Sequence, residues 1–335
     1  MKAARVYPVL ILHLRMDRRR LIFIDPEILA IDLDPIQRAI LSECNGETSL
    51  ATIRKKYPVR KANATIDLVS ARHLLIRRLL PKMLRPRATR WMVIAPHADD
   101  AALSVGGTLL RERRTQQLTL LTLVTHSKTS ILEHISGDPS KVTEWRRRED
   151  QFYADHIGAA LEKGGLKDVM MRRAKPPGRS IADVISQPPT AEDIRQFASR
   201  IRAFIRKRRP DVLVSPLGLG HVDHKATSEA VLRIVAGRKP PSFRLFFYED
   251  LPYSRFNYLD VWRRLLELKK RGLALRPKLI NIAFQLEAKL EALAIYRSQI
   301  PTAWIQLVKE YAQACAFPTR LDLVPRERLW ELSRG

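Results

Sequence analysis

Two short clusters of metal-ligating and acid–base side chains follow apolar runs of the chain. The first cluster is PHADD, directly after the run WMVIA, and the second is HVDH, shortly after the run DVLVSPL. Both combine imidazole with carboxylate groups, the pairing that metal sites and proton-transfer sites use. The candidates are His97, Asp99 and Asp100 in the first cluster, and His221, Asp223 and His224 in the second.

Zinc chemistry is the interpretation that these residue types favour. Side chains at the carboxyl ends of parallel strands project into the crevice where such sheets bind ligands. His97, Asp100 and His224 would supply two nitrogens and one oxygen, a set that suits zinc and leaves a fourth position for water. The alternative is that Asp99, Asp100 and His224 simply cap the helices that follow. Two such clusters, each at a strand end, favour the metal site.

The sequence around the clusters predicts an α/β fold. Apolar runs at 91–96, 117–126, 211–217 and 243–250 have the continuous character of strands buried on both faces, and helical patterns separate them. We therefore expect a Rossmann-like, mostly parallel sheet with helices on both faces. The stretch at about 165–192 lacks a strong period and is predicted to be a long surface loop or lid.

The first 85 residues form a different pattern. Two β-rich runs, VLILHLR and LIFID, predict a hairpin, and three helical stretches follow at 34–44, 49–58 and 64–80. Asp34 and Pro35 are typical of a helix start. The segment 81–90 has two prolines and three arginines and predicts a linker. We therefore expect a small winged-helix domain at 1–85 and a larger domain at 90–335.

Composition limits the remaining function classes. The 60 Lys and Arg residues exceed the 35 acidic ones and give a net charge of +25. This excess suggests nucleic-acid binding, but the basic residues are scattered, so we favour a solvated surface and expect no nucleic-acid partner.

No apolar run reaches the roughly 18–20 residues of a membrane span. The amino terminus lacks a signal-peptide pattern, which predicts a cytoplasmic protein. Cys44 and Cys315 are too isolated for a disulfide framework or a thiolate zinc site.

Residues 90–310 resemble the PIG-L/LmbE family of zinc-dependent de-N-acetylases. PHADD followed by GGTL, and later HVDH, are the two main motifs of the resemblance. Further similar stretches are RRRED with IGA downstream, FYEDLPYS and KLEALAIYRSQ. The chain departs from the family pattern at Ala98, Ala101 and Val222, where proline, glutamate and proline are common. None of these three positions supplies a ligand in the family.

The resemblance implies a role for each residue of the two clusters. It implies zinc ligation by His97, Asp100 and His224, and it makes Asp99 the general base. His221 would stabilise the oxyanion or donate a proton, and Asp223 would tune His221. The implied function is zinc-dependent removal of an N-acetyl or similar acyl group from an N-acetylglucosamine-like sugar conjugate, as in natural-product or glycoconjugate biosynthesis.

Residues 18–80 are similar to the winged-helix PqqD-like domains that bind leader peptides by strand addition. This resemblance implies a peptide or carrier partner for the amino-terminal unit. The alternative is a domain that packs against the enzyme and stabilises it. A different function for the whole chain also stays open at this point, namely a nucleic-acid- or peptide-binding protein whose deacetylase-fold domain is not catalytic.

Overall fold

The structure is a computed structural model, and it describes most of the chain. The described residues are 8–10, 14–16, 20–23, 29–72, 74–77, 88–173, 180–236, 241–315 and 324–333. Within them, no helix is long and apolar enough to cross a bilayer.

A mixed sheet forms the centre of the larger unit. Its strands, within the described residues, run in the order β11–β12–β10–β9–β6–β7–β8. The five strands from β10 to β8 are parallel, β12 is antiparallel to β10, and β11 is antiparallel to β12. The strands are β6 (Arg90–Ala95), β7 (Gln117–His126), β8 (Ala160–Lys167), β9 (Val212–Pro216), β10 (Arg244–Tyr248), β11 (Ala274–Asn281) and β12 (Arg326–Ser333). The predicted mostly parallel α/β sheet is confirmed.

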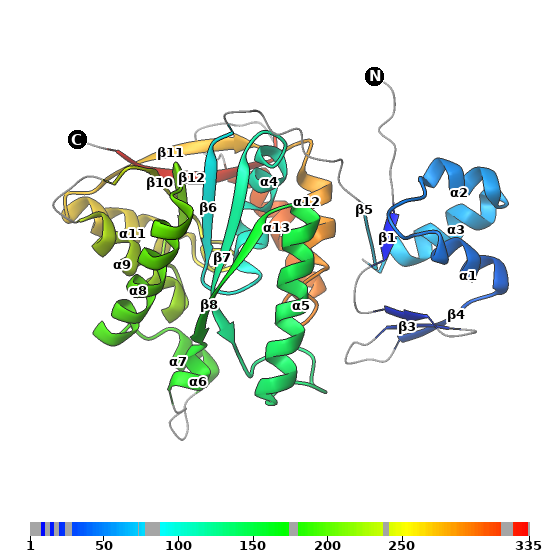
Figure 1. Ribbon diagram of the computed structural model, residues 1–335, viewed down its shortest axis with the longest axis horizontal. Coiled ribbons are helices and arrows are strands. Elements are labelled where there is room, and N and C mark those ends of the chain that lie inside the picture. The colour runs from blue at the N-terminus through cyan, green and yellow to red at the C-terminus, as the bar shows by residue number, and fades with distance from the viewer. Residues whose placement is uncertain are drawn as a thin grey trace.

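Helices cover both faces of the sheet (Figure 1). Successive residues of β6 point to opposite cores, since Val93 packs with one apolar cluster and Met92 with the other. The first cluster includes α4 (Asp100–Glu112), α5 (Pro139–Ile157), α12 (Leu286–Leu293) and α13 (Thr302–Ala314). The second includes α8 (Ala191–Arg208), α9 (Val222–Val235) and α11 (Tyr258–Lys270).

The strand order reverses between β6 and β9. From β6 the chain continues outward to β7 and β8, and from β9 it continues in the opposite direction to β10. The helices after these two strands, α4 and α9, pack into opposite cores. The loops that leave β6 and β9 therefore diverge and open a crevice, the position where open α/β sheets bind ligands.

Strands β8, β11 and β12 and the short helices α6 (Val169–Arg172) and α7 (Ile181–Ile185) are among the elements of this unit that were not predicted. The segment 165–192, expected to be a loop, contains the end of β8 and both of these helices. Strands β8 and β11 lie at the two edges of the sheet. Both carry many charged or glycine residues, ALEKGGLK and ALRPKLIN, so neither has the apolar run that identifies a buried strand.

Helix α4 is interrupted in its middle, and β12 compensates for the interruption. Val105 has non-helical torsion angles, φ −130° and ψ 16°. The N–H groups of Gly107 and Thr108 donate instead to the Glu327 carboxylate, at 2.9 and 2.7 Å. Lys289 of α12 donates to the same carboxylate at 2.6 Å. Because this charge is buried and fully bonded, it ties the carboxyl-terminal elements to the helix that begins at the site.

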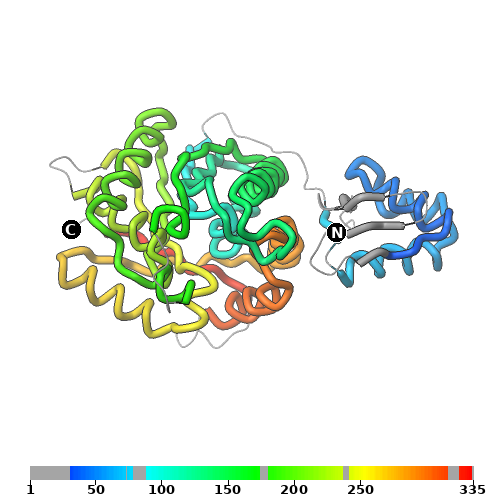
Figure 2. Tube along the Cα trace, turned by 90° about the horizontal axis from the view of Figure 1, so that it is seen from below, coloured from blue at the N-terminus to red at the C-terminus, as the bar shows by residue number. Residues whose placement is uncertain are grey.

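The amino-terminal unit lies to one side of the sheet domain (Figures 1 and 2). Its described residues form two antiparallel sheets, β2–β3–β4 and β1–β5, and three helices. The strands are β1 (Pro8–Leu10), β2 (Leu14–Met16), β3 (Arg20–Phe23), β4 (Leu29–Asp32) and β5 (Leu75–Arg77). The helices are α1 (Pro35–Ser42), α2 (Leu50–Lys56) and α3 (Val59–Ser70).

Several predictions for this unit can be compared with the structure. The hairpin exists as β2–β3, although the first predicted run divides between β1 and β2. Asp34 caps α1 as predicted, with its carboxylate accepting from Gln37 N–H at 2.8 Å. The predicted helix over 64–80 is wrong in its second half. It ends at Ser70, because Leu75–Arg77 pair with β1 instead. Residues 81–87 of the expected linker lie outside the described residues.

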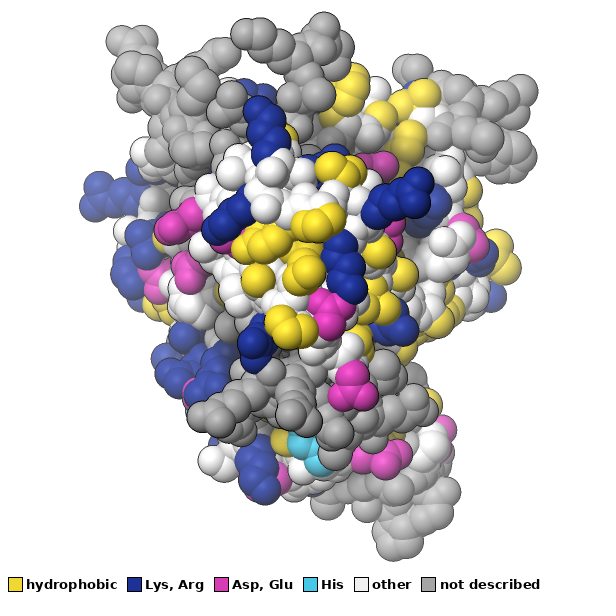
Figure 3. Space-filling model, turned by 90° about the vertical axis from the view of Figure 1, so that its right-hand side faces the viewer, with side chains coloured by type: hydrophobic (Ala, Val, Ile, Leu, Met, Phe, Trp, Pro, Cys, Tyr) yellow, Lys and Arg dark blue, Asp and Glu magenta, His cyan; other side chains and the backbone are white. Residues whose placement is uncertain are grey.

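Arginine side chains join the amino-terminal unit to the sheet domain. Arg77 donates to Glu291 of α12 at 2.6 Å and to Glu287 at 3.2 Å. In the opposite direction, Arg297 donates to the backbone oxygen of Arg72 at 3.0 Å. On the outward side of this unit, Lys and Arg side chains lie scattered among apolar ones instead of forming one stripe (Figure 3).

The glycine pair in α4 allows a direct test of the packing. A Cβ on Gly107 would lie 2.8 and 2.9 Å from Ile282 carbons and 3.0 Å from a Glu327 oxygen. A Cβ on Gly106 would meet its nearest atom at 3.3 Å. We expect Gly107→Ala to be less stable than the matched control Gly106→Ala by about 1–3 kcal/mol, the usual cost of overpacking. Denaturant unfolding of both variants measures the difference, and equal stabilities would contradict it.

Candidate metal centre

All six residues of the two sequence motifs meet in the crevice between β6 and β9. His97 and Asp99 lie in the loop after β6, and Asp100 begins α4. His221 precedes α9, and Asp223 and His224 lie in its first turn. All six are buried, with at most 8% of each residue exposed. The structure therefore brings together every residue that the sequence singled out.

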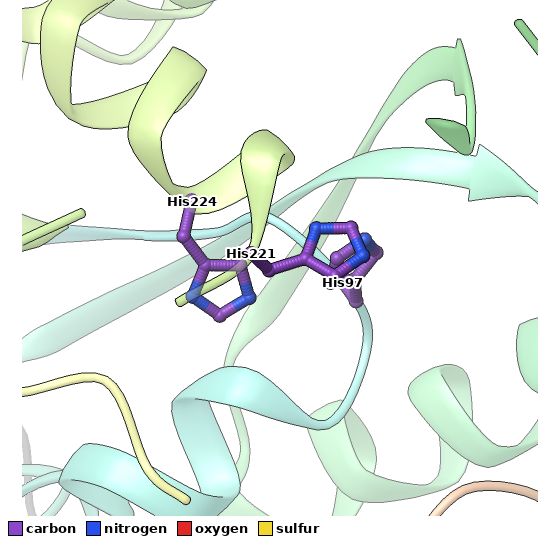
Figure 4. A group of neighbouring side chains, drawn as sticks. All are labelled: His97, His221 and His224. Carbon is purple, nitrogen blue, oxygen red and sulfur yellow. The ribbon is translucent and has the colours of Figure 1, made fainter. Parts of the chain in front are cut away.

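Three imidazoles converge at this point (Figure 4). One ring nitrogen from each of His97, His221 and His224 lies within 4.8 Å of the others, which forms a possible metal site. An Asp100 carboxylate oxygen lies 3.3 Å from His97 Nδ1 and 3.2 Å from His224 Nε2. The same oxygen accepts the backbone N–H of His97 at 2.7 Å, which fixes its position.

Outer carboxylates hold two of the three imidazoles. His97 Nε2 lies 3.2 Å from an Asp223 oxygen, and His224 Nδ1 lies 2.7 Å from an Asp250 oxygen. These bonds turn the remaining nitrogens, His97 Nδ1 and His224 Nε2, toward Asp100. An imidazole that binds a metal almost always donates its other N–H to such a partner. Sequence reasoning missed Asp250, although it lies within FYEDLPYS.

His221 is held differently. Its Nδ1 accepts the backbone N–H of Asp223 at 3.1 Å, so the proton of the neutral ring is on Nε2. Burial, together with the nearby charge of His97, lowers the pKa of His221 well below its ordinary value. The Asp223 carboxylate is 3.9 Å from His221 Nδ1 but 3.2 Å from His97. Its direct contact is therefore with His97.

Asp99 makes no helix cap. It occupies the N-cap position of α4, but its side chain accepts no capping hydrogen bond. The nearest cation is Arg146, 3.8 Å from its carboxylate. Burial and the neighbouring Asp100 raise the pKa of Asp99, and Arg146 opposes them. The capping alternative is therefore wrong for Asp99, and at the second motif His221, not His224, caps α9.

The electrostatics of this crevice favour a cation. Burial by itself lowers the pKa of a histidine, but Asp100 and Asp223 outweigh it and raise the pKa of His97 to about 9. Asp100 and Asp250 likewise raise the pKa of His224 to about 10. The surrounding carboxylates thus stabilise positive charge where the ring nitrogens converge. Two oriented imidazoles and a carboxylate are donors that fit zinc.

An arginine that sequence reasoning missed supports Asp223. Arg172 of α6 donates to the second Asp223 oxygen at 2.6 Å and to Asp193 of α8 at 3.1 Å. The hydrogen bond from His97, together with the nearby His221 and the charge of Arg172, holds the pKa of Asp223 below its ordinary value, although burial opposes this. No motif surrounds Arg172 in the sequence, so only the folded chain identifies it.

A cleft of about 220 Å³ leads to this centre. Polar groups that line it include Thr129, Arg146, Asp168 and Gln299, which come from segments far apart in the chain. Tyr253 also lines it, with its ring centroid 5.3 Å from that of His224. The apolar walls are Leu103, Met170, Ile181, Ile185, Pro252 and Trp304. The fold and site define an α/β protein with a buried group of three histidines that could hold a metal ion at the switch point of its sheet.

Comparison with known proteins identifies the family. A family model described as GlcNAc-PI de-N-acetylase, PIG-L, matches residues 92–235. The 2'-N-acetylparomamine deacetylase of Streptomyces fradiae is 31% identical over 220 residues, which are 64% of this chain and 75% of that protein. The enzyme of the same name from Niallia circulans is 26% identical over 242 residues, 63% of this chain and 84% of that protein. The chain belongs to the PIG-L family and is an N-deacetylase of the hydrolase class.

Solved structures share the fold at lower identity. The zinc-inhibited form of teicoplanin deacetylase matches with a TM-score of 0.57 and 21% identity, over 74% of this chain and 99% of that one. The A40926 pseudoaglycone deacetylase matches with a TM-score of 0.54 and 22% identity, over 73% and 98% of the two chains. The expected α/β deacetylase fold is thereby confirmed.

Proposed function

We propose that this protein hydrolyses the N-acetyl group of an amino-sugar conjugate in natural-product biosynthesis, and that the reaction depends on zinc. The observation that carries the proposal is the buried group of His97, His224 and Asp100, with the buried acid Asp99 beside it, 3.8 Å from Arg146. The relatives support the substrate class, because two are deacetylases of 2'-N-acetylparomamine.

His97 Nδ1, His224 Nε2 and the Asp100 carboxylate would hold the zinc ion. These three atoms face one another, because Asp223 and Asp250 occupy the opposite nitrogens of the two rings. When bound, zinc polarises an amide carbonyl and eases deprotonation of a water molecule. His221 would stay outside the ligand set, because its Nδ1 is occupied and its protonated Nε2 is a donor.

Asp99 would act as the general base. Its carboxylate lies in the cleft without a capping bond, and its raised pKa makes it a better proton acceptor than an ordinary aspartate. His221 Nε2–H would donate to the oxyanion of the tetrahedral intermediate, an interaction worth roughly 2.7–4 kcal/mol in comparable sites. The carbon–nitrogen bond then breaks, and the amine takes a proton from Asp99 or His221.

We also propose that the chain divides into domains at 1–85 and 90–335, with the first recruiting a peptide or carrier partner. The separate sheets of the amino-terminal unit support the division. The ion pairs of Arg77 with Glu287 and Glu291 support a fixed position on α12. If the two parts are independent domains, a chain starting at residue 90 still binds zinc. Loss of zinc binding in that chain would contradict the proposal.

The function is tested on N-acetylated amino sugars, including 2'-N-acetylparomamine. Mass spectrometry should show loss of one acetyl group with zinc-loaded protein.

Asp99→Asn should keep zinc but lower kcat about 10²–10⁴-fold, the usual contribution of a general base. For the wild type, kcat/KM should fall as the pH falls through the raised pKa of Asp99, since the protonated acid accepts no proton. Undiminished turnover by Asp99→Asn would exclude this role.

The ligand set is tested by zinc titration of single variants. We expect His97→Ala and His224→Ala to lose stoichiometric zinc, because each removes one of three donors. His221→Ala is the matched control, since it removes an imidazole from the same crevice but leaves the proposed ligands in place. It should bind about one zinc per chain and lose turnover. If His221→Ala loses zinc as His97→Ala does, the centre has three histidine ligands instead.

A further inference from the structure

A second cavity, of about 280 Å³, adjoins the catalytic cleft. Arg146 lines both spaces and lies 3.8 Å from Asp99. Ala98, between His97 and Asp99 in the chain, also lines the second cavity. The two spaces are therefore separated by one arginine side chain and by the catalytic loop itself.

The local backbone of β7 and β8 shapes this cavity. The pairing register of the two strands shifts twice between Thr122 and His126. At the shift, Gly164 approaches so closely that a Cβ there would lie 2.6 Å from the Leu123 oxygen. Gly165, which lines the cavity, has φ +73° and open space where a side chain would be. The cavity thus results from a strand irregularity that only these glycines permit.

The cavity suits an anion. Three cationic side chains, Arg146, Arg147 and Lys163, and one carboxyl group, Asp150, line it. Arg146 also lies 3.8 Å from Asp99, and Arg147 donates to Glu144 at 2.6 Å, so two of the three positive charges are partly offset by these carboxylates. Asp150 is 3% exposed, and within the described residues its Oδ1 has no hydrogen-bond partner. Burial raises the pKa of Asp150 to about 7, partly opposed by the Thr122 hydroxyl and by Lys163. Near neutral pH the group is protonated in part of the molecules and can donate to a carboxylate.

We propose that this cavity binds the small carboxylate that hydrolysis releases, which is acetate for an N-acetyl substrate. This inference rests on the proposed function. In the reaction, the water oxygen bonds to the acyl carbon and the carbon–nitrogen bond breaks. The acyl group leaves as a carboxylate, and the amine takes the proton. The anion forms beside Asp99 and Arg146, so a cationic space behind Arg146 attracts it and repels the protonated amine.

Acetate binding to the zinc-loaded full chain tests this site directly. The probe is ¹³C-labelled acetate, titrated and followed by NMR in the absence of any sugar. Lys163→Met should weaken acetate binding about tenfold, the effect of losing one charge-assisted hydrogen bond. Lys167→Met, on the same strand but outside the cavity, is the matched control and should bind acetate like the wild type. Asp150→Leu, which removes the buried donor, should also weaken binding.

The outcomes separate this site from the proposed function. Unchanged acetate affinity in both Lys163→Met and Asp150→Leu would overturn the second site, even if the protein deacetylates amino sugars. Weakened affinity in these two variants, with Lys167→Met unchanged, would support the site even if no amino sugar is hydrolysed.

Discussion

Burying several carboxylates beside three histidines is the constraint on which this structure depends. A buried charge is costly unless it is paired and hydrogen-bonded. Here each carboxylate that orients a histidine has its own supports: Asp223 accepts from Arg172, and Asp250 accepts the backbone N–H groups of Gly218 and Leu219 at 2.9 and 3.2 Å. Asp99 alone among the four has only a distant cation, at 3.8 Å. Burial raises the pKa of both Asp99 and Asp250. Asp250 is bonded to His224 and to two backbone N–H groups, whereas the Asp99 carboxylate makes no capping bond, and this difference distinguishes Asp99 as the proton acceptor.

The positions of these groups follow from the sheet. Because β6 and β9 are neighbours at the reversal of strand order, their loops bring together residues that are far apart in the chain. Elements from the carboxyl-terminal part of the chain then hold helix α4 in place. Glu327 of β12 accepts the N–H groups that the interruption of α4 leaves without helical partners, and Lys289 completes the pairing. Strands remote from the reaction thereby hold the helix on which Asp100 lies.

The charge distribution around the centre is asymmetric. The carboxylates converge on the histidines, whereas the cations Arg146, Arg147 and Lys163 lie on the side of α5 and β8. Hydrolysis of an amide yields one anion and one cation when the amine is protonated. A centre with opposite charges on its two sides has a physical means of separating such products, and Arg146 lies at the boundary.

The sequence by itself determined the sheet class, the capped start of α1 and the six residues of the two motifs. It did so because buried parallel strands are continuously apolar and because imidazoles and carboxylates at strand ends are costly without a ligand. Only the tertiary structure decided which nitrogen of each histidine faces inward, since Asp223, Asp250 and Arg172 act from other segments. It also decided that the segments of β5, β8, β11 and β12 are strands. Their sequences are short or mixed with polar residues, and they become strands because they pair with neighbouring strands. Long-range pairing supplies the stability that local pattern lacks, and so these elements carry no signal in the sequence.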